Sequence, residues 1–333
     1  MIGVDLFWWI MGTGLIIYVM TGGADYGGGV WDLLARGKEQ ARERRMIEAA
    51  IGPIWEVNHI WVIFIIVTMF SVFPKAFAAI CIALHIPISL VVVGMILRGA
   101  CFTFRGYGLQ PGATAKRWGM IFAWASLITP IFLGMTLAAT SSGEIRLVDG
   151  EVTSGYFSGW LSPFAVCTGV LTLVIFSLTA AVYLLHEVEP DMVQRFRDRA
   201  FKAQIVVLVL LAIVYGLAHR DAPIFAEQLD NSALIWPLRF FIVLAVGAVF
   251  WSLKNKHDDL ARMAVVAQVA GVVLGWGLAM DRYLVIPDLT IDNAGAHQET
   301  LEAMAPVFIA GAVLLVPALF MLFRVFKSKS KEA

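Results

Sequence analysis

Charged residues are scarce in this chain of 333 residues. They make up 15% of the sequence, whereas hydrophobic residues reach 59% and the mean hydropathy is +0.79. A soluble domain carries about 25% charged residues, and a soluble fold of this length would expose much of the apolar surface. The composition therefore excludes a cytosolic globular enzyme and favours a bundle of membrane-spanning helices. Neither sign of charge is in excess, with 25 Lys and Arg against 25 Asp and Glu, so no nucleic-acid partner is expected.

Cysteine is almost missing, and so are the local patterns of several binding sites. Cys81, Cys101 and Cys167 form no CxxC pair, which excludes a disulfide framework and a cysteine metal site. The glycine-rich tract at residues 21–29 lacks the strand-to-helix context of a phosphate-binding loop, so nucleotide binding is not predicted. The first apolar run has neither the basic start nor the small-residue cleavage site of a signal peptide, and it is expected to be a retained span.

Apolar runs of membrane-spanning length recur along the whole chain. There are nine, at residues 6–22, 55–73, 76–98, 119–140, 161–186, 203–219, 233–253, 263–284 and 303–325. Pro74 separates the second run from the third, which predicts a tight helical hairpin there. Gly27, Gly28 and Gly29 are expected to break the helix after the first span, before a polar helix from Trp31 to Ile51. The sequence thus predicts an all-α polytopic membrane protein with nine transmembrane helices and no soluble domain.

The basic residues predict the orientation of these spans. Twenty of the 25 Lys and Arg residues lie in alternate connections and in the carboxyl-terminal tail. Basic residues near the ends of spans are retained in the cytoplasm. The amino terminus is therefore predicted outside and the carboxyl terminus in the cytoplasm, with an ordered outside loop or cap from Asp281 to Met304.

Three ionisable residues near span ends are candidates for a functional site, because such residues are costly in a membrane. Asp25 follows the first span, Glu56 starts the second, and Arg98 ends the third. The predicted orientation places all three at the cytoplasmic face. They could admit protons there, or they could form only an interfacial salt bridge.

Histidines near this patch allow further interpretations. His59 lies three residues after Glu56 and shares its helix face, so the two could relay a proton. His59 and His85, on neighbouring spans, could in principle ligate a haem, but His85 is predicted near the middle of its span, at a different depth. A di-iron site would need a second Glu-x-x-His helix and two more glutamates, which the sequence does not offer. Packed histidines and no metal site are expected.

Five blocks of the sequence resemble the signature blocks of subunit II of the cytochrome bd family of quinol oxidases. They are Thr21–Gly29, Gly52–Trp61, Arg98–Arg105, Ser162–Phe164, and Leu289–Ala294 with Thr300, Leu301 and Met304. The blocks keep the family's order and are spread over nearly the whole chain. The resemblance also agrees with the nine spans and the outside amino terminus.

This resemblance implies a fold and a function. The fold would be two four-helix bundles, within residues 1–141 and 161–284, plus a ninth helix at 303–325. The function would be that of a haem-free subunit of a quinol:oxygen oxidoreductase in the bacterial inner membrane. It would stabilise the haem-bearing subunit I, which holds haem b and haem d (or b). Further expected partners are membrane lipid, a structural quinone and small single-helix subunits.

The resemblance also assigns roles to residues. Asp25, Glu56 and Arg98 fall on the family's cytoplasmic proton path, with Trp55 adjacent. His59 and Asn58, in the same block, complete the set of candidate site residues.

Departures from the family pattern keep two alternatives open. The family usually has Asp at Gly22 and Glu56, Gly at Val57, a non-histidine at His59 and an acid at Thr103. The chain thus belongs on a divergent branch, and it could be a bd-like structural partner in a membrane redox complex that does not reduce oxygen. A secondary transporter is less favoured, because its polar residues would gather near the bilayer centre rather than at one face.

Overall fold

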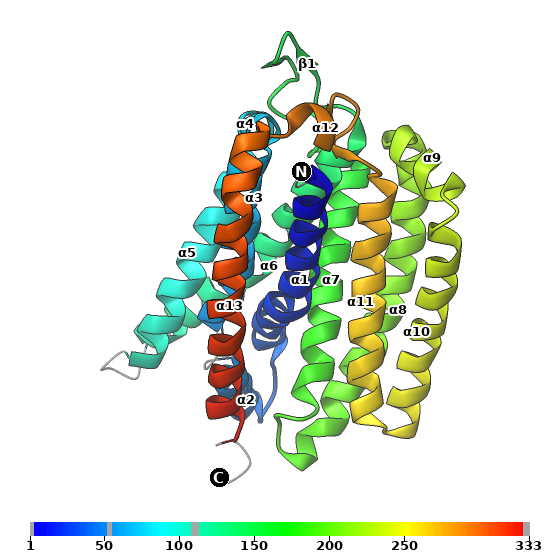
Figure 1. Cartoon of the computed structure of the whole chain (residues 1–333). Coiled ribbons are helices and arrows are strands. Elements are labelled where there is room, and N and C mark those ends of the chain that lie inside the picture. The colour runs from blue at the N-terminus through cyan, green and yellow to red at the C-terminus, as the bar shows by residue number, and fades with distance from the viewer. Residues whose placement is uncertain (1–2, 52–54, 108–112, 329–333) are drawn as a thin grey trace.

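Long helices packed side by side make up nearly all of this protein (Figure 1). The computed structural model describes residues 3–51, 55–107 and 113–328. Its long helices are α1 (Val4–Leu34), α3 (Trp55–Val72), α5 (His85–Tyr107), α6 (Ala113–Ser142), α7 (Pro163–Leu184), α8 (Pro190–Asp221), α10 (Ile235–Asn255), α11 (Asp258–Ala279) and α13 (Gln298–Ser328). Within the described residues, eight helices are long and apolar enough to cross a membrane, and α3 taken with α4 gives up to nine. The polytopic all-helical prediction is confirmed.

Short elements lie at the two ends of the bundle. They are α2 (Gln40–Ile51), α4 (Pro74–Ala83), α9 (Pro223–Asn231) and α12 (Ile291–Ala294), and two antiparallel pairs, β1 (Leu147–Val148) with β2 (Glu151–Val152) and β3 (Tyr283–Val285) with β4 (Leu289–Thr290). Figure 1 shows α4, α9, α12 and β1 at the end that holds the amino terminus, and α2 at the end of the carboxyl terminus. The segment predicted as an ordered cap is ordered, because β3, β4 and α12 form there and Thr290 caps α12.

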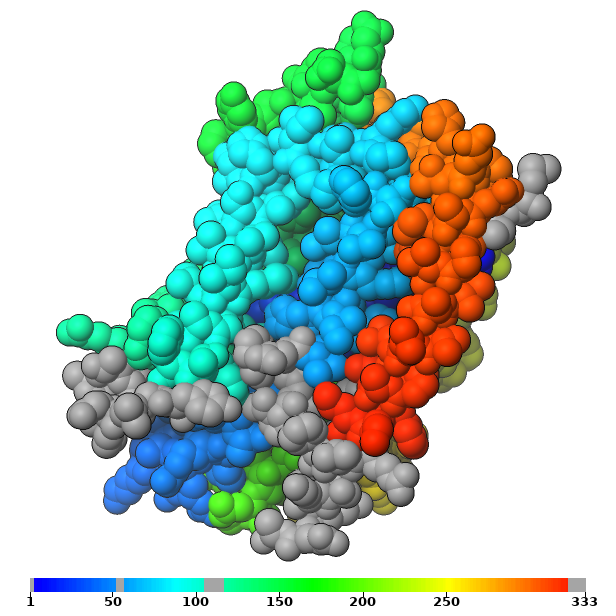
Figure 2. Space-filling view, turned by 60° about the vertical axis from the view of Figure 1, so that its left-hand side comes forward, coloured from blue at the N-terminus to red at the C-terminus, as the bar shows by residue number. Residues whose placement is uncertain are grey.

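Helix α7 is the centre of the packing. It contacts α1, α6, α8 and α11, and 61% of its apolar stretch is buried. Helix α5 packs chiefly on α6, and α10 on α11. Helix α13 is peripheral: only 6% of its apolar stretch is buried, and it runs beside α3 (Figure 2). The same view shows a hollow between α3 and α5.

The prediction that Gly27 to Gly29 break the first helix is wrong. Helix α1 continues to Leu34, and the polar helix begins at Gln40 rather than at Trp31. These glycines instead let neighbouring helices come close. A Cβ atom on Gly27 would lie 2.0 Å from the carbonyl oxygen of Phe176 on α7, and one on Gly29 would lie 2.3 Å from Ser126 on α6. Glycine in a membrane helix marks such close packing.

The predicted third span, residues 76–98, is two helices. Helix α4 begins at Pro74 and is bent by 116° from α3, since proline cannot continue a helix through its interior. Helix α5 then runs from His85 to Tyr107. His85 therefore begins its span instead of lying near the middle, and Arg98 lies inside its helix instead of ending it.

Candidate functional site

Helices α1, α3 and α5 bring three polar side chains together inside the protein. Asp25, Asn58 and Arg98 are 3%, 2% and 1% exposed. The Asn58 amide Nδ2 donates a hydrogen bond of 2.6 Å to Oδ2 of Asp25. Arg98 is near enough for its positive charge to act on the Asp25 carboxylate. Together they form a buried carboxylate site in which an amide and a guanidinium stabilise the negative charge.

Arg98 faces aromatic rings. Its Cζ atom lies 4.4 Å from the ring centroid of Tyr26 and 5.4 Å from that of Phe122, which are cation–π distances. Among the described residues, none of its three guanidinium nitrogens has a hydrogen-bond partner. Burying a cation without acceptors for its N–H groups costs free energy. We therefore expect hydrogen-bond acceptors close to the Arg98 guanidinium.

Tyr26 connects this cluster to its surroundings. Its ring stacks on Phe176 at 6.0 Å and lies 6.4 Å from the ring of His59. The hydroxyl of Tyr18 approaches the Tyr26 hydroxyl at 3.5 Å. The sequence analysis did not single out Tyr18 or Tyr26. The one signal that the sequence offers is that Tyr26 directly follows Asp25.

The structure brings Asp25, Asn58, His59 and Arg98 into one region, as the sequence predicted. Glu56 and Trp55 begin α3 next to them, but their side chains lie outside the described residues. The role of all six in proton transfer stays a prediction.

The predicted position at the cytoplasmic mouth needs correction for Asp25 and Arg98. Each lies nine residues before the end of its helix, at Leu34 and Tyr107 respectively. Nine residues correspond to about 13 Å of helix. Both side chains therefore lie well inside the bundle, because α1 and α5 extend beyond the predicted spans.

His59 and His85 lie too far apart to share a haem. The part of α3 from His59 to Val72 covers about 20 Å, and α4 follows before His85. The exposed His85 lies with Nδ1 2.9 Å from the carbonyl oxygen of Ile82 and its ring against Tyr156. Within the described part of the chain, no group of three or more His, Cys, Asp or Glu side chains is arranged to hold a metal ion.

These features define a class: a polytopic helical membrane protein with a carboxylate, amide and guanidinium cluster buried among its first helices. The sequence model of the family "Cytochrome bd terminal oxidase subunit II" matches residues 4–326. The chain belongs to this family of respiratory quinol oxidase subunits.

Individual relatives and a solved structure agree with this assignment. The chain is 26% identical over 361 residues to the cytochrome bd-I ubiquinol oxidase subunit 2 of Escherichia coli K12, covering 95% of this chain and 91% of that protein. It is 24% identical over 281 residues to the cytochrome bd ubiquinol oxidase subunit 2 of Bacillus subtilis, covering 82% and 80%. The fold is similar to that of the bd oxidase from Geobacillus thermodenitrificans, with a TM-score of 0.80 and 21% identity over 97% of this chain and 98% of that one.

Proposed function

We propose that this chain is the haem-free subunit II of a bd-type membrane quinol:oxygen oxidoreductase, which stabilises a haem-bearing subunit I and supplies it with protons from the cytoplasm. Family membership supports the assembly with subunit I. The proposal of a proton path rests on one observation. The Asp25 carboxylate is buried, accepts a hydrogen bond from Asn58 and has Arg98 as its counter-charge.

The physical chemistry of the cluster suits proton exchange. Burial favours the neutral acid, whereas the Asn58 hydrogen bond and the Arg98 charge favour the anion. Because the two effects oppose each other, neither protonation state is favoured by the whole of the surroundings. Glu56, at the start of α3, would hand protons to this group, with His59 as a second titratable side chain and Trp55 beside it.

The remaining parts of the proposal concern arrangement and partners. Helices α1, α3, α5 and α6 would form one four-helix bundle and α7, α8, α10 and α11 the other, with α13 beside them. The end that holds α2 would face the cytoplasm of a bacterial inner membrane. Subunit I would carry haem b and haem d (or b), and small single-helix subunits, lipid and a structural quinone would complete the complex.

Substitutions in the purified complex test the proton path. Glu56→Gln and Asp25→Asn remove a titratable group but keep its shape, so both should slow quinol oxidation while haem content stays at the wild-type level. Glu56→Asp keeps the acid and should remain active. Full turnover in both Glu56→Gln and Asp25→Asn would contradict the path, and loss of haem together with activity would indicate structural ion pairing instead.

The haem-free role has its own test. Because the proposal assigns all haem to subunit I, His59→Ala and His85→Ala should leave the reduced-minus-oxidised spectrum of the complex unchanged. Loss of one haem signal in either variant would show that this chain supplies a ligand.

The alternative, a partner subunit in a complex that does not reduce oxygen, draws on one departure from the family pattern. Gly22 stands where the family usually has Asp, and a Cβ atom there would lie 2.8 Å from the Tyr18 ring, so no acid fits without movement. Oxygen consumption by the purified complex with quinol as donor separates the two functions.

A further inference from the structure

Helix α2 packs against α1 between Asp25 and the end of the bundle. Asp25 lies nine residues above the end of α1, and the apolar side chains Ile47 and Ile51 of α2 lie close to Gly28. Both isoleucines are buried. A proton route along this side of α1 would therefore need polar groups between these apolar side chains.

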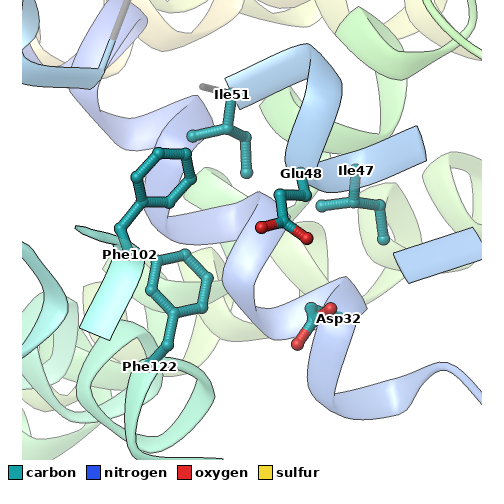
Figure 3. Close-up of a pocket in the computed structure, with 6 residues that line it drawn as sticks. All are labelled: Asp32, Ile47, Glu48, Ile51, Phe102 and Phe122. Carbon is teal, nitrogen blue, oxygen red and sulfur yellow. The ribbon is translucent and has the colours of Figure 1, made fainter. Parts of the chain in front are cut away.

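A small cavity lies beside Ile47 and Ile51 (Figure 3). Its volume is about 10 Å³, which is the space of roughly one water molecule. Helices α1, α2, α5 and α6 line it with Asp32, Ile47, Glu48, Ile51, Phe102 and Phe122. Two of the six lining residues are carboxylic acids, whose oxygens can bind a water molecule.

The two acids differ in burial. Asp32 is 2% exposed, whereas Glu48 is half-buried. Glu48 can therefore exchange protons with water at the end of the bundle, while Asp32 lies behind it. The cavity therefore lies between the half-buried Glu48 and the buried Asp32.

Asp32 is aligned with Asp25 on α1. Residues seven apart share one face of a helix, and seven residues span about 10 Å. Gly29 lies between them on this face, and Ser126 of α6 lies against Gly29. The Ser126 hydroxyl is fully buried and has no hydrogen-bond partner among the described residues. A buried polar group of this kind calls for a partner such as a bound water, and it lies about halfway between the two carboxylates.

Phe122 adds a second link between the cavity and the site. It lines the cavity, and its ring lies under the Arg98 guanidinium at 5.4 Å. Phe122 and Ser126 are one turn apart on α6. Arg98 of α5 therefore lies over a ring that lines the cavity, one turn of α6 from Ser126.

We infer that Glu48 and Asp32 form a proton-collecting pair that passes protons through the cavity and past Ser126 to Asp25. The inference rests on the proposed function and adds to it a second entry, which reaches Asp25 by a route other than Glu56. Glu48 takes a proton from water and gives it to a water in the cavity, which protonates Asp32. Asp32 then passes the proton towards Asp25 by way of Ser126, and each group returns to its starting state. No bond other than those to the moving proton changes.

Among the described residues, Arg44 is a charged neighbour of Asp32. Nε of Arg44 lies 3.8 Å from Oδ1 of Asp32 and donates a hydrogen bond of 3.1 Å to its backbone carbonyl oxygen. This positive charge favours the anionic form of Asp32 between transfers. An ion pair that only holds α2 against α1 would use the same contact, so the test must separate the two roles.

The experiment compares Asp32→Asn with Arg44→Gln in the purified complex. Asp32→Asn removes the titratable group, and Arg44→Gln breaks the same ion pair but leaves the carboxylate. Asp32→Asn should lower quinol oxidase turnover by about tenfold, less than the usual loss for a proton donor to a reacting group, because the pair only relays protons. Its decline in activity should also begin at lower pH than in the wild type. Arg44→Gln keeps the carboxylate and should lose clearly less turnover than Asp32→Asn, and Asp32→Glu should restore activity.

Further variants make each outcome decisive. Ser126→Ala, which removes only the hydroxyl, should slow turnover at unchanged haem content. If Asp32→Asn does not assemble, the turnover of Ser126→Ala alone tests the inference. Normal turnover in Asp32→Asn or in Ser126→Ala, or equal losses in Asp32→Asn and Arg44→Gln, would overturn the inference. If Asp25→Asn is slow while Asp32→Asn is normal, the proposed function stands and only this entry is wrong. If Asp25→Asn and Glu56→Gln are also normal, the proposed function fails as well.

Discussion

The Asn58 amide donates its hydrogen bond to the Asp25 carboxylate across 2.6 Å and thereby joins α3 to α1. Both side chains are buried, so neither can be satisfied by bulk water. Asn58→Ala should therefore destabilise the complex by about 1.5–3 kcal/mol, the usual worth of a hydrogen bond to a charged group. Thermal unfolding of the purified complex measures this loss. In the double variant with Asp25→Asn the added loss should shrink, and equal losses in both backgrounds would show that the bond contributes nothing.

Close packing of α1 on α7 predicts a second result. A Cβ atom on Gly27 would lie 2.0 Å from the carbonyl oxygen of Phe176, so Gly27→Ala should cost about 1–3 kcal/mol or more through overpacking. Gly12, on the same helix, has nothing within 4 Å of its added Cβ, and Gly12→Ala should be neutral or slightly stabilising. Melting temperatures of the two variants test the contrast, and equal behaviour would contradict the described packing.

A buried acid on α2 predicts a third result. Glu43 is fully buried and pairs with Arg199 and, at 3.1 Å, with Arg195, both on α8. Removing one partner of a buried ion pair leaves uncompensated charge. Glu43→Gln should lower stability by about 3 kcal/mol, at the low end for such losses because Arg195 is 36% exposed. The control is Glu39→Gln, whose side chain is 51% exposed and which should change stability little.

The end of the bundle near α9 predicts a dependence on pH. Hydrogen bonds from Arg239 first, and from His219 and Tyr215, lower the pKa of Asp230 from 3.8 to about 2. A carboxyl with a lowered pKa stabilises the fold above its unfolded pKa and loses this contribution as the pH falls towards its folded pKa. The difference in melting temperature between wild type and Asp230→Asn should fall by roughly half from pH 5 to pH 3. A difference that stays unchanged down to pH 3 would show that the Asp230 pKa is not lowered.

Orientation in the membrane gives a fifth prediction. If the basic connections lie in the cytoplasm, a reporter fused after Ala333 should be active only there. A reporter inserted at Gly150, between β1 and β2, should be active only outside. Signals from both on one side would overturn the predicted topology and the cytoplasmic entry with it.

Sequence alone predicted most of the long apolar helices and singled out Asp25 and Arg98, because both depend on local features. Hydropathy is a property of each segment, and the candidate acids stood out from apolar surroundings. The course of the helix through Gly27 was not predictable, since it depends on how closely Phe176 approaches from a distant helix. The depth of Arg98 was missed for a related reason: α5 continues to Tyr107 through residues whose polarity suggested a loop. Asp32 had a usable signal, its spacing of seven from Asp25, but Glu48 is brought to the same cavity only by the fold.

Helix α1 has two unlike sides. Towards α7, a Cβ atom on Gly23 or Gly27 would come within 2.6 Å or 2.0 Å of Phe176, so this seam has no room even for a methyl group. Asp25 lies between these glycines in sequence and points to the opposite side of the helix, the side of Asp32 and the cavity. The proton path proposed for α1 therefore runs on the side of the helix away from α7, where Asn58 of α3 and the cavity residues of α2, α5 and α6 lie.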